Sequence, residues 1–324
     1  MNKVECTLCP RHCKLAQGQR GDCRVRTNVN GKLFSLVYGN PCAVHVDPIE
    51  KKPVFHMLPG TTAFSIATAG CNLHCLYCQN WEISQSQPEE TRNSAMAPEI
   101  VVASTLQAGC RSIAYTYSEP VVFYEYTLDT SRLAREKNIR NIIVTAGYIE
   151  QEPLLELCKV TDAASVNLKG ITDDFYKKMC NATLRPVQDA ILAMKKKGVW
   201  VEIINLVIPT WNDSDDDIRG LARWVKENCG KETPLHLSRF WPMHKLQNLP
   251  PTPETTLSRA WDISRAEGLD YVYVGNIPEH PGNSTKCPSC EKIIIKRYGY
   301  QILENHMDGG KCGYCKAPIP GIWQ

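Results

Sequence analysis

The chain has 324 residues, a formal net charge of +3 and 22% charged residues, so it can bury one large core with small appended modules. This weak charge gives no sign of a nucleic-acid partner or of an anionic membrane surface. Without an apolar run of ~20 residues or a signal-peptide core, the sequence predicts a cytoplasmic protein that neither enters nor binds a membrane.

Sixteen cysteines are many for a chain of this size, and most fall into three groups. C-x2-C pairs in a long chain without an export signal indicate metal sites rather than disulfides, because disulfide scaffolds are usually short and secreted. The remaining cysteines stand alone and are expected to be small buried hydrophobic residues; they are Cys42, Cys110, Cys158, Cys180 and Cys229.

Residues 1–62 form the first expected unit, a Cys-rich module followed by a connector. Its cysteines have the spacing C-x2-C-x3-C-x9-C and are Cys6, Cys9, Cys13 and Cys23. Four thiolates suit either zinc or an iron–sulfur cluster, and a metal would hold so small a segment together. The alternative is four unligated cysteines in a surface loop. Within the proline-rich connector, the charged run 47–52 is expected to be a solvated turn.

Residues 63–278 alternate apolar runs with helix-like segments. The candidate strands are Ala63–Thr68, Ser112–Tyr115, Asn141–Thr145, Ala163–Asn167, Val199–Val207, Leu235–Arg239 and Tyr271–Val274. The candidate helices are Pro98–Ala108, Pro120–Glu136, Glu152–Val160, Asp173–Met179, Val187–Lys196, Ser214–Glu227 and Thr252–Glu267. This pattern predicts an α/β fold, a full or partial (β/α) TIM-like barrel, with an open doubly wound sheet as the alternative.

Three cysteines follow the first predicted strand directly, where the mouth of a barrel should lie. Cys71, Cys75 and Cys78 have the spacing C-x3-C-x2-C. Three thiolates can hold a four-iron four-sulfur (4Fe-4S) cluster and leave one iron open for a substrate. Tyr77 precedes the last cysteine, where an aromatic ring could pack over the cluster. The alternative is a zinc knuckle, which normally needs a second nearby pair of ligands.

This motif, with its aromatic residue before the third cysteine, resembles the signature of the radical S-adenosylmethionine (radical SAM) enzymes. The resemblance implies a 4Fe-4S cluster and S-adenosylmethionine as cofactors. In that family the open iron chelates the methionine amino and carboxylate groups. Reduction of the sulfonium then produces a 5′-deoxyadenosyl radical that abstracts hydrogen from a C–H bond. An electron donor such as flavodoxin or ferredoxin is therefore expected.

The same resemblance assigns roles to polar residues after later strands. Glu119 takes the place of the family's ligand for the methionine amino group; the alternative is a cap on the next helix. Thr145 falls near the ribose position. Asn167 and Lys169 share one face of an extended segment, and Lys169 resembles the lysine that reaches the methionine carboxylate or the substrate; a solvated lysine is the alternative. His244 falls where activating enzymes carry a histidine near S-adenosylmethionine.

Residues 279–324 form the third expected unit, which resembles a zinc ribbon. It carries two C-x2-C pairs, made by Cys287, Cys290, Cys312 and Cys315. Four thiolates suit structural zinc, and a rubredoxin-like iron site has similar geometry. Because such a site has no open position, we expect a structural or partner-binding role.

Nearly the whole chain resembles the radical SAM member of the set called AmmeMemoRadiSam, which is similar to pyruvate formate-lyase activating enzymes. Three functions follow as hypotheses. The first is radical chemistry on a glycine of a partner protein. The second is the same chemistry on a small molecule or another protein side chain. The third is a non-catalytic metal-binding scaffold. The set's name also points to companion proteins.

Overall fold

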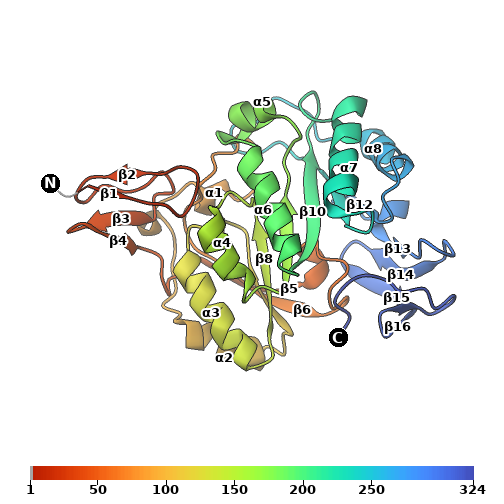
Figure 1. Ribbon diagram of the computed structural model, residues 1–324, viewed down its shortest axis with the longest axis horizontal. Coiled ribbons are helices and arrows are strands. Elements are labelled where there is room, and N and C mark those ends of the chain that lie inside the picture. The colour runs from red at the N-terminus through yellow and green to blue at the C-terminus, as the bar shows by residue number, and fades with distance from the viewer. Residues whose placement is uncertain (1–2) are drawn as a thin grey trace.

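An eight-stranded sheet forms the centre of the computed structural model, which describes residues 3–324 (Figure 1). Its strands, in sheet order, are β12 (Val272–Gly275), β11 (Leu235–Arg239), β10 (Trp200–Val207), β9 (Ala163–Asn167), β8 (Arg140–Thr145), β7 (Ser112–Tyr115), β6 (Thr62–Ala67) and β5 (Ala43–Pro48). The strands β6 to β12 run parallel, and β5 pairs antiparallel with β6. Because β5 and β12 do not pair with each other, the predicted barrel is partial rather than closed.

Helices connect the parallel strands and lie outside the sheet (Figure 1). They are α1 (Trp81–Ser84), α2 (Pro98–Gln107), α3 (Tyr124–Glu136), α4 (Gln151–Cys158), α5 (Asp173–Phe175) with the π-helical turn η3 (Tyr176–Cys180), α6 (Arg185–Lys196), α7 (Asp215–Cys229) and α8 (Glu254–Ala266). The caps explain several boundaries. The Ser214 hydroxyl accepts a hydrogen bond from the Asp217 backbone N–H at 3.2 Å, and Gly198 has a positive φ of 79° just after α6.

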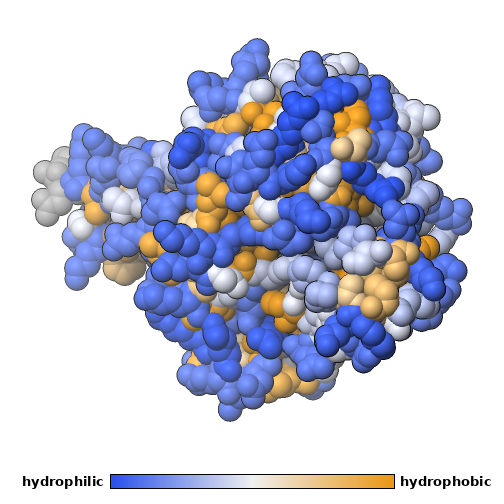
Figure 2. All heavy atoms as spheres, turned by 45° about the vertical axis from the view of Figure 1, so that its right-hand side comes forward, coloured by the Kyte–Doolittle hydropathy of each residue, from blue (hydrophilic) through white to orange (hydrophobic). Residues whose placement is uncertain are grey.

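Within residues 3–324, every helix falls short of the length and apolar character that crossing a bilayer would need. Figure 2 shows a largely hydrophilic face on which hydrophobic side chains are scattered.

Two small hairpins form the N-terminal module and project from one side of the sheet (Figure 1). They pair β1 (Val4–Glu5) with β2 (Lys14–Leu15), and β3 (Arg26–Val29) with β4 (Lys32–Ser35). The segment assigned to the connector is partly regular, because β5 belongs to the central sheet. It continues into the short 3₁₀ helix η1 (Ile49–Lys51).

The C-terminal module packs beside the open edge of the sheet. Its strands are β13 (Thr285–Lys286), β14 (Ile293–Tyr298), β15 (Gln301–Asn305), β16 (Met307–Asp308) and β17 (Lys311–Cys312), after the 3₁₀ helix η4 (Pro281–Asn283). Phe55 and Tyr273 share one buried cluster with Cys287 and Ile294. The module therefore covers apolar surface that the open barrel would otherwise expose to water.

A buried polar network lies beneath this junction. Glu202 is fully buried and accepts hydrogen bonds from His236 Nε2 at 2.7 Å and from the backbone N–H of His56 at 2.8 Å. His56 Nδ1 lies 2.7 Å from the Pro320 carbonyl oxygen, which can only accept, so Nδ1 carries the proton. Its Nε2 lies 2.6 Å from the Tyr273 hydroxyl. The network joins the sheet to the end of the chain.

This network predicts loss of stability in mild acid. Burial lowers the pKa of His56 from 6.5 to about 4, and the nearby Arg297 also opposes its protonation. Between these values the unfolded chain binds a proton that the folded chain does not, so stability falls as the pH falls from 6.5 to 4. The slope should reach about 1.4 kcal/mol per pH unit. Burial alone would raise the pKa of Glu202, but the hydrogen bond from His236 outweighs it and lowers the pKa to about 2. The stability that ionised Glu202 contributes is therefore lost only at lower pH.

Urea unfolding of the protein and of its His56→Gln variant between pH 6.5 and 4.5 checks this expectation. Thiolate–metal bonds also weaken in acid, but they contribute equally to both proteins. The variant should therefore show a shallower decline in unfolding free energy. Parallel declines would show that His56 does not titrate as stated.

Candidate active site

A large cavity opens at the carboxyl ends of the parallel strands. Its volume is about 510 Å³, within the ordinary range for small-molecule sites. Its walls include Cys71, Cys75, Tyr77 and Cys78 after β6; Thr116, Tyr117 and Glu119 after β7; Thr145 and Ala146 at β8; Asn167 and Lys169 at β9; and His236, Ser238 and Asn276 at β11 and β12. This is the end of the sheet where barrel enzymes place their chemistry.

The three motif cysteines all line this cavity, on a loop fixed by backbone contacts. The backbone N–H groups of His74 and Leu76 donate to the carbonyls of Cys180 and Met179, each at 3.0 Å. Gly70, just before the first ligand, has φ +91°, and a Cβ there would lie 2.5 Å from the Cys23 carbonyl oxygen. Only glycine fits this turn, which holds the loop against the N-terminal module.

The donor set fits a cluster better than a single ion. Among residues 3–324, three cysteines and no fourth line this cavity, whereas a closed zinc site of thiolates needs four. Cys71 Sγ accepts from the Leu73 N–H at 3.4 Å, and Cys78 Sγ lies 3.1 Å from Ser84 Oγ. Such contacts stabilise the sulfurs of an iron–sulfur cluster.

Lys169 supplies positive charge beside these thiols. Its side chain lines the cavity, and Nζ lies 5.8 Å from the centre of the Tyr77 ring. Burial alone would lower the pKa of Lys169, but the surrounding thiols, Cys75 first, raise it above its usual value. No carboxylate of residues 3–324 pairs with this ammonium group, which suits an anionic cluster or a substrate carboxylate.

Glu119 and its neighbours form a second polar group in the cavity. The Thr145 hydroxyl donates to Glu119 Oε1 at 2.5 Å, and the Ala146 N–H donates to Oε2 at 2.7 Å. Asn167 Nδ2 donates to the Thr145 carbonyl at 3.2 Å. Burial raises the pKa of Glu119. Glu119 also accepts from the Val121 N–H at 3.2 Å. It does not cap the next helix, because α3 begins at Tyr124 with Phe123 at the N-cap position and no side-chain cap.

His244 is the one predicted barrel residue that does not line the cavity. It stacks on Trp81, with ring centroids 5.3 Å apart and planes 19° apart. The next residue, Lys245, donates its backbone N–H to the Leu76 carbonyl at 2.9 Å, so the loop rests on the cysteine motif. The catalytic role of His244 stays a prediction.

Two features of the site were missed from the sequence. Cys180, expected to be an inert buried residue, is buried but lies 3.3 Å from the Tyr77 hydroxyl, beside the motif. The solvated turn expected at 47–52 is wrong in part: Lys52 and Asp47 are buried and form an ion pair at 2.6 Å. Lys52 Nζ lies 4.3 Å from the centre of the Tyr117 ring, and burial lowers the pKa of Lys52 to about 8.

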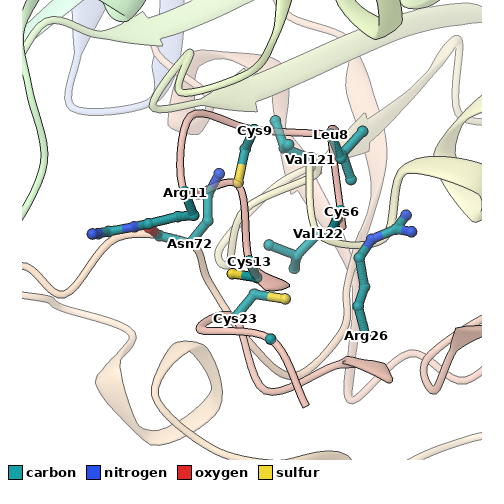
Figure 3. A pocket seen from close by; sticks show the side chains of 11 residues that line it. Cys6, Leu8, Cys9, Arg11, Cys13, Cys23, Arg26, Asn72, Val121 and Val122 are labelled. Atoms are coloured by element: carbon teal, nitrogen blue, oxygen red, sulfur yellow. The ribbon is translucent and has the colours of Figure 1, made fainter. Parts of the chain in front are cut away.

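The other two cysteine groups lie outside this cavity. In the C-terminal module, Cys287 Sγ lies 3.6 Å from Cys315 Sγ, and Cys290 Sγ lies 3.7 Å from Cys312 Sγ. Tetrahedral zinc with Zn–S bonds of about 2.3 Å would place sulfurs about 3.8 Å apart, so the group fits a single zinc or iron ion. The N-terminal cysteines line a separate, small pocket (Figure 3).

The fold and the site together define a class of enzyme, and comparison with known proteins identifies it. The sequence model of the family described as the radical SAM superfamily matches residues 65–224. A protein of Methanocaldococcus jannaschii described as uncharacterized is 46% identical over 98% of this chain and 95% of its own length. The pyruvate formate-lyase-activating enzyme of Clostridium pasteurianum is 29% identical over 48% of this chain and 66% of its own length.

Solved structures agree on the fold. A radical SAM methyltransferase from Sphaerobacter thermophilus superimposes with a TM-score of 0.55 and 20% identity over 68% of each chain. Streptococcus suis SuiB bound to precursor peptide SuiA gives a TM-score of 0.53 and 13% identity over 70% of this chain and 51% of that one. Residues 65–224 of this chain therefore form a radical SAM domain. Its assignment to the AmmeMemoRadiSam set stays a prediction.

Proposed function

We propose that this chain reductively cleaves S-adenosylmethionine and uses the resulting 5′-deoxyadenosyl radical to abstract hydrogen from a substrate. The observation that carries the proposal is the meeting of Cys71, Cys75 and Cys78 with the unpaired ammonium of Lys169 in one cavity. A bound 4Fe-4S cluster would supply the electron and an open iron. The family match supports this class of chemistry.

The chain's own residues then bind and orient S-adenosylmethionine. Glu119 has three hydrogen-bond donors on its two oxygens, and a carboxylate can accept about four, so one position remains for the methionine ammonium. Lys169 offers its free Nζ to the methionine carboxylate. Thr145 and Asn167 fix the ends of β8 and β9 between these two groups. Such anchoring places the sulfonium against the motif loop, which is how orientation lowers the barrier.

A glycine of a partner protein is the substrate that the cavity rim favours. Trp81, Trp241 and Tyr300 are 39%, 46% and 45% exposed. Tyr300 lines the cavity, and Gln79, another wall residue, donates to the Trp241 carbonyl at 3.1 Å. Tryptophan and tyrosine are enriched at protein interfaces. The named activating enzymes among the relatives support the same choice. A small-molecule substrate is the second candidate, because 510 Å³ accommodates one.

Isotope transfer distinguishes these substrates. Host cells are grown with deuterated glycine, and their extract is divided by ultrafiltration into macromolecules and small molecules. Each fraction is added to the reduced protein with S-adenosylmethionine. The expected result is deuterium in 5′-deoxyadenosine from the macromolecular fraction. A glycyl-radical EPR signal should accompany it, split into a doublet by the remaining α-hydrogen with unlabelled extract and collapsed with deuterated extract. Label arising only from the small-molecule fraction would contradict the protein substrate.

Two tyrosines of the C-terminal module provide a matched pair of variants. Tyr300 and Tyr314 are equally exposed, at 45%, but only Tyr300 lines the cavity. Tyr300→Ala should lower the rate of label transfer from the macromolecular fraction by about tenfold, whereas Tyr314→Ala should leave it unchanged. Equal rates of label transfer in the two variants would show that the exposed aromatic residues around the cavity do not contribute to binding a protein substrate.

A further inference from the structure

We propose that the N-terminal pocket holds a second iron–sulfur cluster, ligated by Cys6, Cys9, Cys13 and Cys23. All four cysteines line one enclosed pocket. Figure 3 shows the side chains of Cys9, Cys13 and Cys23 around this pocket, together with Asn72, Val121 and Val122.

The backbone of the module is folded to present these thiols. The Cys6 N–H donates to the Cys13 carbonyl at 3.0 Å, which closes the first ligand loop. A Cβ at Gly21 would lie 3.7 Å from both Cys13 Sγ and Cys23 Sγ, so the chain passes close between these two sulfurs. Hairpins this short have almost no apolar core, and a bound metal group would supply the missing cross-links.

The N-terminal sulfurs are less closely gathered than those of a preformed tetrahedral site. The C-terminal quartet shows what such a site looks like in this chain, with all four sulfurs within 4.8 Å of one another. Among residues 3–324, neither the four N-terminal cysteines nor the three motif cysteines form such a closely spaced group of sulfurs. In a four-iron cluster each thiolate binds a different iron, and in a two-iron cluster two thiolates bind each iron. The ligand sulfurs of a cluster therefore lie farther apart than those around a single ion. Four thiols that line one pocket without being drawn together around one point therefore suit a polynuclear cluster better than a single zinc ion.

The surroundings also suit an anionic cluster. Arg26 lines the pocket and is only 6% exposed. One end of its guanidinium pairs with Glu125, whereas its Nε has no hydrogen-bond partner within residues 3–324. An unpaired buried donor is costly, and a cluster sulfur would satisfy it. Cys13 Sγ accepts from the Asp22 N–H at 3.4 Å, the same type of N–H···S contact that Cys71 makes with Leu73.

The pocket adjoins the first cluster site through one residue. The Asn72 side chain lines the N-terminal pocket, while its neighbour Cys71 lines the large cavity. Arg11 Nε donates to the Asn72 carbonyl at 3.0 Å, so both ligand loops are tied to the same peptide. This inference concerns a different pocket from the proposed reaction, and its test below does not depend on cleavage of S-adenosylmethionine.

The test removes the first cluster and asks what remains. A Cys71→Ala/Cys75→Ala/Cys78→Ala variant is produced anaerobically with iron supplementation and analysed for iron, acid-labile sulfide and zinc. About four iron and four sulfide per chain should remain, with an EPR signal after reduction. The sulfide should disappear when Cys6 and Cys9 are also changed to serine. Zinc, iron without sulfide, or no metal in place of these findings would overturn the proposal.

A second measurement keeps the proposal testable if the multiple variants fold poorly. In the otherwise intact protein, Arg26→Gln should shift one of two cluster potentials to a more negative value, because a nearby positive charge favours the reduced, more anionic state. Arg20→Gln is the control. Arg20 lies in the same module and pairs with Glu89 at 2.6 Å, as Arg26 pairs with Glu125, but Arg20 does not line the pocket. A single cluster potential, or one insensitive to Arg26→Gln, would overturn the assignment to this pocket.

Discussion

Replacement of Cys71, Cys75 and Cys78 by alanine is expected to abolish cleavage of S-adenosylmethionine. All three line the cavity, and no other cysteine forms part of its wall, as far as residues 3–324 are concerned. Loss of the thiolates removes the group that supplies the electron, so activity should fall to background rather than by a measurable factor. Product analysis by liquid chromatography and mass spectrometry checks this expectation.

Cys229→Ala provides the control for this experiment. Cys229 is buried at the end of α7 and should affect stability modestly through a small cavity, without affecting the cluster. Unchanged cleavage in the triple variant, alongside normal cleavage in the control, would show that the motif is not the catalytic site.

Arg297→Ala is expected to destabilise the protein by about 3–5 kcal/mol, the cost of removing one partner from a buried ion pair. Arg297 and Glu50 have no exposed side-chain surface, and their charged atoms lie 3.8 Å apart. The guanidinium also lies 4.2 Å from the centre of the Phe55 ring and donates to the Phe55 carbonyl at 3.0 Å. Its removal should loosen the C-terminal module from the open edge of the sheet.

The neighbouring residue Lys296 is a matched control. Its ion pair with Glu304 is 2.9 Å long, but both side chains are 48% exposed, so Lys296→Ala should cost at most about 1 kcal/mol. Urea unfolding of both variants measures the difference. Equal, small losses would mean that the C-terminal module does not stabilise the barrel through Arg297.

The seven parallel strands were predictable because each is a short apolar run between helices with recognisable caps. Local pattern and spacing suffice for such βα units. The ends of the same strands correctly indicated that Glu119, Thr145, Asn167 and Lys169 would meet, because parallel strands end at one mouth.

The features that escaped prediction depend on contacts between distant segments. Cys180 approaches the motif only because η3 packs against it through the backbone contacts of His74 and Leu76. Likewise, Lys52 belongs to a charged run that looks solvated, yet Asp47 and Tyr117 compensate its burial. Sequence pattern cannot supply such pairings, because nothing in the local spacing records them.

The docking of the C-terminal module shows the same limit. Its two C-x2-C pairs predicted a separate ribbon, and the structure brings their sulfurs together as that pattern implies. Nothing in the ribbon sequence indicates that Arg297 would cross to Phe55 and Glu50.

The central claim is that this chain cleaves S-adenosylmethionine reductively at the mouth of its partial barrel. The most direct measurement is mass spectrometry of the products formed by the anaerobic, cluster-loaded protein with a one-electron reductant and S-adenosylmethionine. We expect 5′-deoxyadenosine and methionine in equal amounts, formed slowly without the true substrate. A reduced, cluster-loaded protein that yields no 5′-deoxyadenosine, with or without host extract, would contradict the account.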